Sequence, residues 1–468
     1  MEKLCKSVAE AIERAGLRDG MTISFHHHLR NGDYVLNLVV DTAAALGIRN
    51  LTINATSIFD CHLPLLEHIR NGVVTGIETD YMAAAFGKEI SEGLLERPVL
   101  FRSHGTRPSD ILAGRSHIDV AFIAAPTADP MGNCTGRLGK SACGPLSYSV
   151  ADAMCADRVV VITDNLVPYP LTTRSITEAY VDHVVEVESI GDPKGIVSGV
   201  VRMTNDPIAL KIADYAAQAI AASGLLVDGF AFQTGGGGAS LATAHYLHRI
   251  MLERGVKGSY ALGGITGYLV DMLHDGCFAA IQDAQCFDLR AIESLRDDPA
   301  HIEITTAEYA SPRAKSTAAS HLDVCLLGAT EIDTGFNVNV HTDSNGYIIG
   351  GSGGHTDIAR AARLTIVVAP LSRARMSTVV DEVLTLSTPG SSIDLLVTQY
   401  GVTVNPARPE IEEAMKRARL PVIDIHELRR MALEMNGPAA PRRRRGGRVV
   451  AEVLGLDSEV QDVIYAVR

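Results

Sequence analysis

The apolar residues of this chain alternate between two patterns. Short continuous apolar runs predict strands that are buried on both faces. Apolar runs of this kind lie at residues 99–101, 120–123, 159–163 and 184–187, and two earlier strands are expected at residues 21–25 and 51–53. Between them, segments such as residues 36–45 repeat apolar positions every three or four residues, as an amphipathic helix does. The alternation predicts an α/β fold, with a mainly parallel sheet and crossover helices.

The chain also repeats itself. Residues 117–133 can be laid over residues 321–337, and six of the seventeen positions are identical. Such internal similarity predicts two tandem copies of one fold. We therefore expect two pseudo-repeated domains, at residues 1–210 and 211–468, each a mainly parallel sheet flanked by helices.

A glycine-rich stretch is the strongest candidate for chemistry. An apolar run at residues 230–233 leads into Gly235, Gly236, Gly237 and Gly238, and a helical pattern follows. A glycine turn between a strand and a helix places free backbone N–H groups at the positive end of the helix dipole. It can therefore cradle a carboxylate, a phosphate or an oxyanion, although a simple tight turn is the alternative.

Two nucleotide motifs are only approximated. The glycine stretch lacks the full G-x-G-x-x-G pattern and the acidic residue that binds ribose. Residues 134–141 match a phosphate-binding P-loop except that Cys134 replaces the first glycine, and no strand pattern precedes them. The sequence therefore does not predict an ATP site.

A second glycine cluster contains Gly353 and Gly354 and follows a polar segment with Glu331 and Asn337. We expect Asp357 to cap a helix at residues 358–364, and Asn337 to hold a turn. Two glycine cradles in one domain exceed what packing requires, which favours a shared binding site.

His26, His27 and His28 follow the first strand of their repeat, as the glycine stretch does in the second. We expect the two loops to face one another across a cleft between the domains. With Arg30, the histidines could bind a polyanionic substrate, whereas packed or exposed histidines are the alternative. Their spacing does not suit a metal ion, and we predict no metal site.

Composition narrows the choice of partners and compartment. The 468 residues are 46% hydrophobic and carry a net charge of −13, which argues against nucleic acid as a partner. Eight scattered cysteines favour a reducing cytoplasm, and neither a signal peptide nor a membrane-spanning run is recognisable.

Residues 436–447, which include Arg442–Arg445, predict an exposed loop before two closing strands at 449–454 and 460–467.

Seven segments together resemble the citrate lyase alpha chain family. They lie at residues 23–28, 67–72, 232–242, 261–266, 331–340, 351–355 and 405–410, and the likeness runs over nearly the whole chain. The resemblance implies two tandem CoA-transferase domains and a citrate:acetyl-acyl-carrier-protein transferase. It also implies an oligomer with a citryl lyase beta chain and a gamma chain, the acyl carrier protein (ACP). In this family no cofactor is bound by the chain itself, because the acyl thioester rides on the phosphoribosyl-dephospho-CoA arm of that ACP, for which acetyl-CoA is a surrogate.

The resemblance also implies a mechanism without a protein nucleophile. Residues 261–266 hold no carboxylate where glutamate-dependent CoA-transferases carry theirs. Citrate would attack the acetyl thioester directly to give a mixed anhydride, and backbone N–H groups would stabilise the oxyanion. The expected catalytic residues are Gly235, Gly236, Gly237, Gly238, Gly353 and Gly354. The expected substrate-binding residues are His26, His27, His28, Arg30, Gly263, Gly264, Glu331, Asn337, His355, Arg373 and Arg375.

Three other functions remain open at this point. A covalent CoA-transferase would use Glu331 as its nucleophile. A citramalate lyase alpha chain would differ only in its substrate. A sugar-phosphate-sensing regulatory domain is the third possibility, but the chain lacks the basic DNA-binding module that would accompany it.

Overall fold

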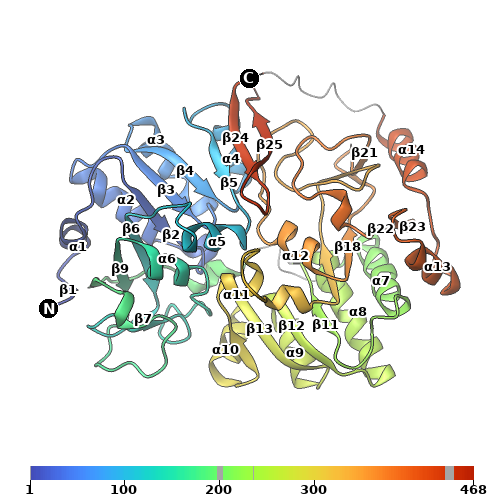
Figure 1. Cartoon of the computed structure of the whole chain (residues 1–468), viewed down its shortest axis with the longest axis horizontal. Helices are drawn as coiled ribbons and strands as arrows, with labels where there is room; N and C mark the ends of the chain where they lie inside the picture. Colours follow the sequence, from blue (N-terminus) through green and yellow to red (C-terminus); the bar gives the residue numbers. More distant parts are fainter. Residues whose placement is uncertain (1, 198–203, 236, 438–446, 468) are drawn as a thin grey trace.

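Two large sheets, one for each half of the chain, dominate the fold (Figure 1). The computed structural model describes residues 2–197, 204–235, 237–437 and 447–467. Helices flank both sheets, so the predicted α/β class is confirmed. Gly236 and the arginines Arg442–Arg445 lie outside the described residues.

The first sheet has ten strands. Their order is β1 (Leu4–Cys5), β10 (His183–Glu186), β9 (Arg158–Thr163), β6 (Val120–Ala125), β2 (Thr22–Phe25), β3 (Leu51–Ala55), β4 (Val74–Thr79), β5 (Val99–Phe101), β24 (Val449–Leu454) and β25 (Val460–Tyr465). All neighbours pair in parallel except the last two, which form an antiparallel hairpin. β3 and β6 are buried along their whole length, which explains the continuous apolar sequence of β6.

The second sheet has eight strands. Their order is β14 (His301–Glu303), β13 (Phe278–Cys286), β12 (Gly258–Ile265), β11 (Ala231–Gln233), β15 (Val324–Leu327), β18 (Leu364–Val368), β22 (Leu395–Thr398) and β23 (Gly401–Val404). Only the β22–β23 pair is antiparallel.

The two sheets share one topology. The order β10-β9-β6-β2-β3-β4-β5 in the first sheet corresponds strand for strand to β22-β18-β15-β11-β12-β13-β14 in the second. The segments that repeat in sequence form the equivalent strands β6 and β15. The predicted duplication is therefore confirmed, and β2 and β11 hold equivalent inner positions.

Fourteen α-helices connect and cover the strands of the described chain. They are α1 (Val8–Ala15), α2 (Val35–Ala45), α3 (Leu65–Arg70), α4 (Ala84–Ser91), α5 (Thr106–Leu112), α6 (Ser149–Cys155), α7 (Pro207–Ala222), α8 (Gly238–Arg254), α9 (Gly267–His274), α10 (Leu289–Asp297), α11 (Thr306–Ala310), α12 (His355–Ala361), α13 (Pro409–Arg417) and α14 (Ile425–Asn436). Local sequence sets their ends: Ser7 caps the start of α1 by accepting from the N–H of Glu10, and Gly16 ends it in a left-handed conformation. Of the described residues, none belongs to a helix long and apolar enough to cross a bilayer.

Seven short strands form three small sheets outside the two large ones. They are β7 (Thr127–Ala128) with β8 (Cys134–Thr135), β16 (Glu331–Asp333) with β17 (Val338–Asn339) and β21 (Val379–Val380), and β19 (Ser372–Arg373) with β20 (Met376–Ser377).

The hairpin β24–β25 crosses from the second half of the chain to the first sheet, where β24 pairs with β5 (Figure 1). The two closing strands predicted from sequence are thus present. A division at residue 210 nevertheless places this hairpin in the wrong half, because its hydrogen bonds belong to the N-terminal sheet.

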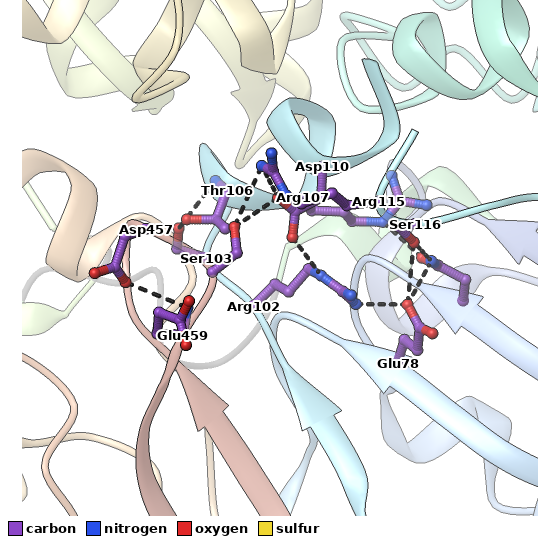
Figure 2. Close-up of polar contacts among 12 residues, drawn as sticks. Glu78, Arg102, Ser103, Thr106, Arg107, Asp110, Arg115, Ser116, Asp457 and Glu459 are labelled. Atoms are coloured by element: carbon purple, nitrogen blue, oxygen red, sulfur yellow. Dashed lines mark hydrogen bonds and ion pairs between the residues drawn. The ribbon is translucent and has the colours of Figure 1, made fainter. Parts of the chain in front are cut away.

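A buried ion network anchors the turn of this hairpin (Figure 2). Arg102 lies between Glu78 and Asp110 and donates to both carboxylates. The hydroxyl of Ser458, at the tip of the turn, donates to Asp110 at 2.6 Å. Burial alone would raise the pKa of Asp110, but the hydrogen bonds from Ser458, Arg115 and Arg102 outweigh it and lower the pKa. The carboxylate therefore stays charged and holds the turn in place.

Candidate active site

A cavity of about 330 Å³ lies between the two halves. It opens where strands of both sheets end: Tyr81 follows β4, His104 follows β5, and Gly235 follows β11. The carboxyl ends of parallel strands are where α/β folds bind their ligands. The described residues that line it are Tyr81, His104, Tyr148, Gln233, Thr234, Gly235, Gly263, Gly264, Ala284, Gln285, Phe287, Tyr309, Leu327, Gly328, Ser352, Gly354 and His355.

At two of these positions an added Cβ would clash with an aromatic side chain. A Cβ on Gly264 would lie 2.3 Å from the ring of Phe287, and one on Gly354 would lie 2.6 Å from the hydroxyl of Tyr309. Both aromatic side chains line the cavity themselves, so the absent side chains leave room for the aromatic walls and for a ligand to reach the backbone.

The first glycine cradle has the strand–turn–helix geometry that the sequence predicts. β11 ends at Gln233, and α8 begins at Gly238 with Gly237 as its N-cap residue. Gly237 has φ −76° and ψ 153°, and among the described residues no side chain caps this helix. The first N–H groups of α8 are therefore left without a side-chain acceptor, as an anion site requires.

The second cradle is similar but belongs to a shorter helix. Gly354 is the N-cap residue of α12 and has no side chain to cap it, and the hydroxyl of Ser352 accepts from the N–H of Thr356 in the first turn at 3.4 Å. His355 is the first residue of α12. Its Nδ1 lies 2.8 Å from the hydroxyl of Thr388, and its Nε2 lies 2.9 Å from the carbonyl oxygen of Gly328. Burial lowers the pKa of His355 to about 4, so this ring lines the cavity as a neutral group.

The three consecutive histidines lie behind the cavity and are not among the residues that line it. His26 contacts Asp152 at 2.9 Å, and His27 contacts Thr56 and, from the other half of the chain, Gln285. Burial is the main reason that the pKa of all three rings is lowered. Neutral rings are poor binders of citrate carboxylates, so the predicted cationic role is not supported by this geometry.

Arg30 is better placed to supply positive charge. Its guanidinium lies 4.7 Å from the ring centre of Phe287, which lines the cavity, and 5.3 Å from that of Phe59. Burial lowers its pKa, yet an arginine side chain keeps its proton in proteins.

Four predicted substrate-binding residues lie elsewhere. Glu331 is buried in β16, where Ser344, Asn339 and the N–H of Leu384 donate to its carboxylate. Asn337 holds a turn, as expected, by accepting from the N–H of Gly390. Arg373 and Arg375 belong to the β19–β20 hairpin, which packs against α14. The structure does not bring these side chains to the cavity.

Asp357 does not cap a helix at residues 358–364, because α12 begins earlier, at His355, and contains this aspartate. Its buried carboxylate instead forms hydrogen bonds with residues of the N-terminal half. It accepts from the hydroxyl of Ser103 at 2.6 Å and from the N–H of Gly105 at 3.0 Å, at the start of α5. The aspartate therefore joins the two halves beside the cavity.

Replacing Asp357 with asparagine is expected to flatten the dependence of stability on pH. Burial, opposed by the bonds from Ser103 and Gly105, raises the pKa of Asp357 to about 7 in the folded chain. An unfolded aspartate ionises near ~4, so the wild type should lose stability as the pH rises from ~4 to ~7, by about 4 kcal/mol at most. Urea unfolding of Asp357→Asn at pH 4, 6 and 8 should show a smaller loss, and an unchanged profile would refute the assignment.

The sequence did not reveal one prominent pair of residues. His104 lines the cavity, and its Nδ1 lies 2.9 Å from the carboxylate of Asp80. The signal that could have found them is position, because each follows a strand whose carboxyl end faces the cleft: β4 precedes Asp80 and β5 precedes His104.

Comparison with known proteins now adds to this geometry. The family described as citrate lyase, alpha subunit (CitF) matches residues 1–467. The chain belongs to the citrate lyase alpha subunit family. Citrate lyase alpha chains of Escherichia coli K12 and Klebsiella pneumoniae are 47% and 46% identical to it over 466 residues. These matches cover 100% of this chain and 91% and 92% of those relatives.

Solved structures agree with this assignment. A crystal structure of a citrate lyase alpha subunit from Streptococcus mutans in complex with citrate superposes with a TM-score of 0.97 at 46% identity. The match covers 99% of this chain and 91% of that one. A malonate decarboxylase alpha subunit from Acinetobacter baumannii shares the fold, with a TM-score of 0.67 at 14% identity over 94% of this chain and 93% of its own. Citrate lyase alpha chains are the citrate CoA-transferase component of citrate lyase, and the chain is an enzyme of this class.

Proposed function

We propose that this chain transfers the acyl carrier from an acetyl thioester to citrate in the cavity between its halves. The observation that carries the proposal is that both glycine cradles meet at one cavity, which Gly235 and Gly354 line together. The citrate-bound relative from Streptococcus mutans supports the choice of substrate.

The reaction needs two acyl transfers. A citrate carboxylate oxygen attacks the acetyl carbonyl. The C–S bond breaks, the thiolate departs, and an acetyl–citryl anhydride is formed. The thiolate then attacks the citryl carbonyl, and acetate departs with one oxygen that came from citrate. Each step passes through a tetrahedral oxyanion, for which the uncapped N–H groups of α8 are suitable donors.

The lining of the cavity favours this direct route over a covalent one. Among the described residues that line it, none carries a carboxylate or a thiol. Glu331, the nucleophile of the alternative mechanism, is buried and held by donors from Ser344 and Asn339. The protein would therefore act by holding both acyl partners in place, which can supply about 7–11 kcal/mol of the barrier.

The same proposal names the partners of the reaction. The acyl group would be carried by a gamma chain, an acyl carrier protein with a phosphoribosyl-dephospho-CoA arm, and a beta chain would cleave the citryl thioester. These chains would form an oligomeric complex in the cytoplasm, and this chain would bind no cofactor of its own. Membership of a family of alpha subunits supports such an assembly.

A single-turnover experiment with oxygen-18 tests the proposal. Citrate labelled in its carboxylates is mixed with acetyl-CoA, as surrogate thioester, and an excess of the purified chain. Direct attack puts one label into the first acetate formed and one into the carbonyl of citryl-CoA. A glutamyl-enzyme route gives unlabelled acetate in the first turnover, because that oxygen comes from the protein.

Two controls complete the test. Glu331→Gln should retain the label transfer, and hydroxylamine should trap no enzyme-bound acyl group. Turnover with citramalate but not with citrate would support the reaction class but refute citrate as the substrate.

A further inference from the structure

His104 is tied to the second glycine cradle through the main chain. Its N–H donates to the carbonyl of Gly353 at 2.8 Å, and the N–H of Gly353 donates to the carbonyl of Asp80 at 3.1 Å. The side chain of Asp80 also holds the ring of His104 at Nδ1. The imidazole is therefore fixed in position from both its backbone and its side chain.

The other ring nitrogen of His104, Nε2, belongs to a side chain that lines the cavity. A Cβ added to Gly353 would lie 3.3 Å from Nε2, so the glycine leaves this atom uncovered. Among the described residues, Nε2 has no hydrogen-bond partner, and the side chain is 15% exposed. A ligand in the cavity can reach it.

Two carboxylates and two aromatic rings surround the imidazole of His104. Two carboxylates act on it: Asp80, in contact, and Asp357, in the adjoining helix α12. The rings of Tyr148 and His27 pack on it at 4.9 and 5.6 Å between centres. Burial lowers the pKa of His27, so that neighbour is neutral. Burial raises the pKa of Asp80, while the hydrogen bond and charge of His104 oppose that rise.

We propose that His104 binds a citrate carboxylate through Nε2 as an imidazolium, so that citrate binding takes up one proton. A neutral imidazole has a single N–H, and an ionised Asp80, which can only accept, favours that N–H at Nδ1, 2.9 Å from its carboxylate. Nε2 then carries a lone pair, which repels a carboxylate until the ring is protonated. Asp80 is a positioning residue, since it selects the nitrogen that carries the first proton. The inference rests on the proposed function.

Calorimetric titration of citrate into the full chain tests the proposal. The titration is run at about pH 8, where free histidine is neutral and citrate is fully ionised. Repeating it in buffers with different ionisation enthalpies gives the number of protons taken up, which is expected to be close to one. The citrate Kd of the wild type should also rise about tenfold for each further pH unit, by linkage.

Variants separate a binding role from a structural one. His104→Gln should abolish the proton uptake and weaken citrate binding by about 10- to 100-fold, as expected for a lost charge-assisted hydrogen bond. His117→Gln is the matched control, because His117 contacts Asp157 at 3.2 Å but is largely exposed, and it should change neither quantity.

The outcomes distinguish the role of His104 from the proposed function. Citrate binding with heats independent of the buffer, or a Kd independent of pH, overturns the role of His104 and leaves the proposed function standing. Proton uptake that persists in His104→Gln overturns it as well. Absence of citrate binding by the wild type overturns the proposed function itself.

Discussion

Replacing Gly238 with proline is expected to lower kcat by about 10²- to 10³-fold, which is the usual effect of losing one oxyanion donor. Proline lacks the backbone N–H, yet it fits the first position of a helix, where that N–H has no helical partner. Gly238 holds this position in α8. Gly237 already has φ −76° and ψ 153°, the extended conformation that a residue before proline prefers. The substitution should thus remove one donor and keep the helix.

Gly238→Ala is the matched control, because alanine retains the N–H. Transfer from acetyl-CoA to citrate gives kcat, and circular dichroism checks that both variants keep their helix content. Equal activity of the two variants would show that this N–H does not contact the oxyanion.

The second large effect is on stability, and it concerns Asp152. Arg107 donates to both oxygens of this carboxylate, at 2.8 and 2.7 Å, and His26 contacts it at 2.9 Å. All three side chains are buried. Asp152→Ala would leave the guanidinium buried and unpaired, so we expect the free energy of unfolding to fall by about 3–5 kcal/mol.

The chain contains no tryptophan, so urea unfolding of Asp152→Ala is best followed by circular dichroism. The double variant Asp152→Leu/Arg107→Met should recover much of the loss, because it leaves no lone charge. Asp157→Ala removes an exposed carboxylate and should have no measurable effect. A loss for Asp152→Ala no larger than that of this control would contradict the role of the cluster.

The pH dependence of this cluster follows from the pKa of Asp152. Burial alone would raise that pKa, but the charge of Arg107 and the hydrogen bonds from Arg107 and His26 outweigh burial and lower it. A carboxylate with a lowered pKa stabilises the fold at neutral pH, and this contribution is lost only as the pH falls below the range in which an unfolded aspartate titrates, near ~4.

Local patterns were enough to predict the fold because its strands are buried on both faces. Continuous apolar runs mark β6 and β9, and the repeated segment marks β15 as the equivalent of β6. The glycine stretch predicted the turn into α8 because such a turn depends only on the local backbone conformation. The start of α12 was missed, since Gly354 begins the helix before its apolar pattern is recognisable.

The candidate site was predicted less well, because its contacts join residues that are far apart in sequence. His26 and Asp152 are separated by 126 positions, and Ser103 and Asp357 by 254. Nothing near any one of them in sequence indicates its partner. The same reason explains why the sequence placed the last two strands correctly but not the sheet that they join.

The hairpin β24–β25 has a consequence for how the chain is made. Ser458 contacts Asp110 across 348 positions, and β24 covers the edge of β5. A ribosome releases the first half of the chain long before it reaches this hairpin, so the edge of β5 stays open throughout that time. Open strand edges invite pairing with other chains. The edge of the N-terminal sheet is therefore covered only after the second half has been synthesised. Until translation is complete, the N-terminal half is exposed to aggregation through this edge.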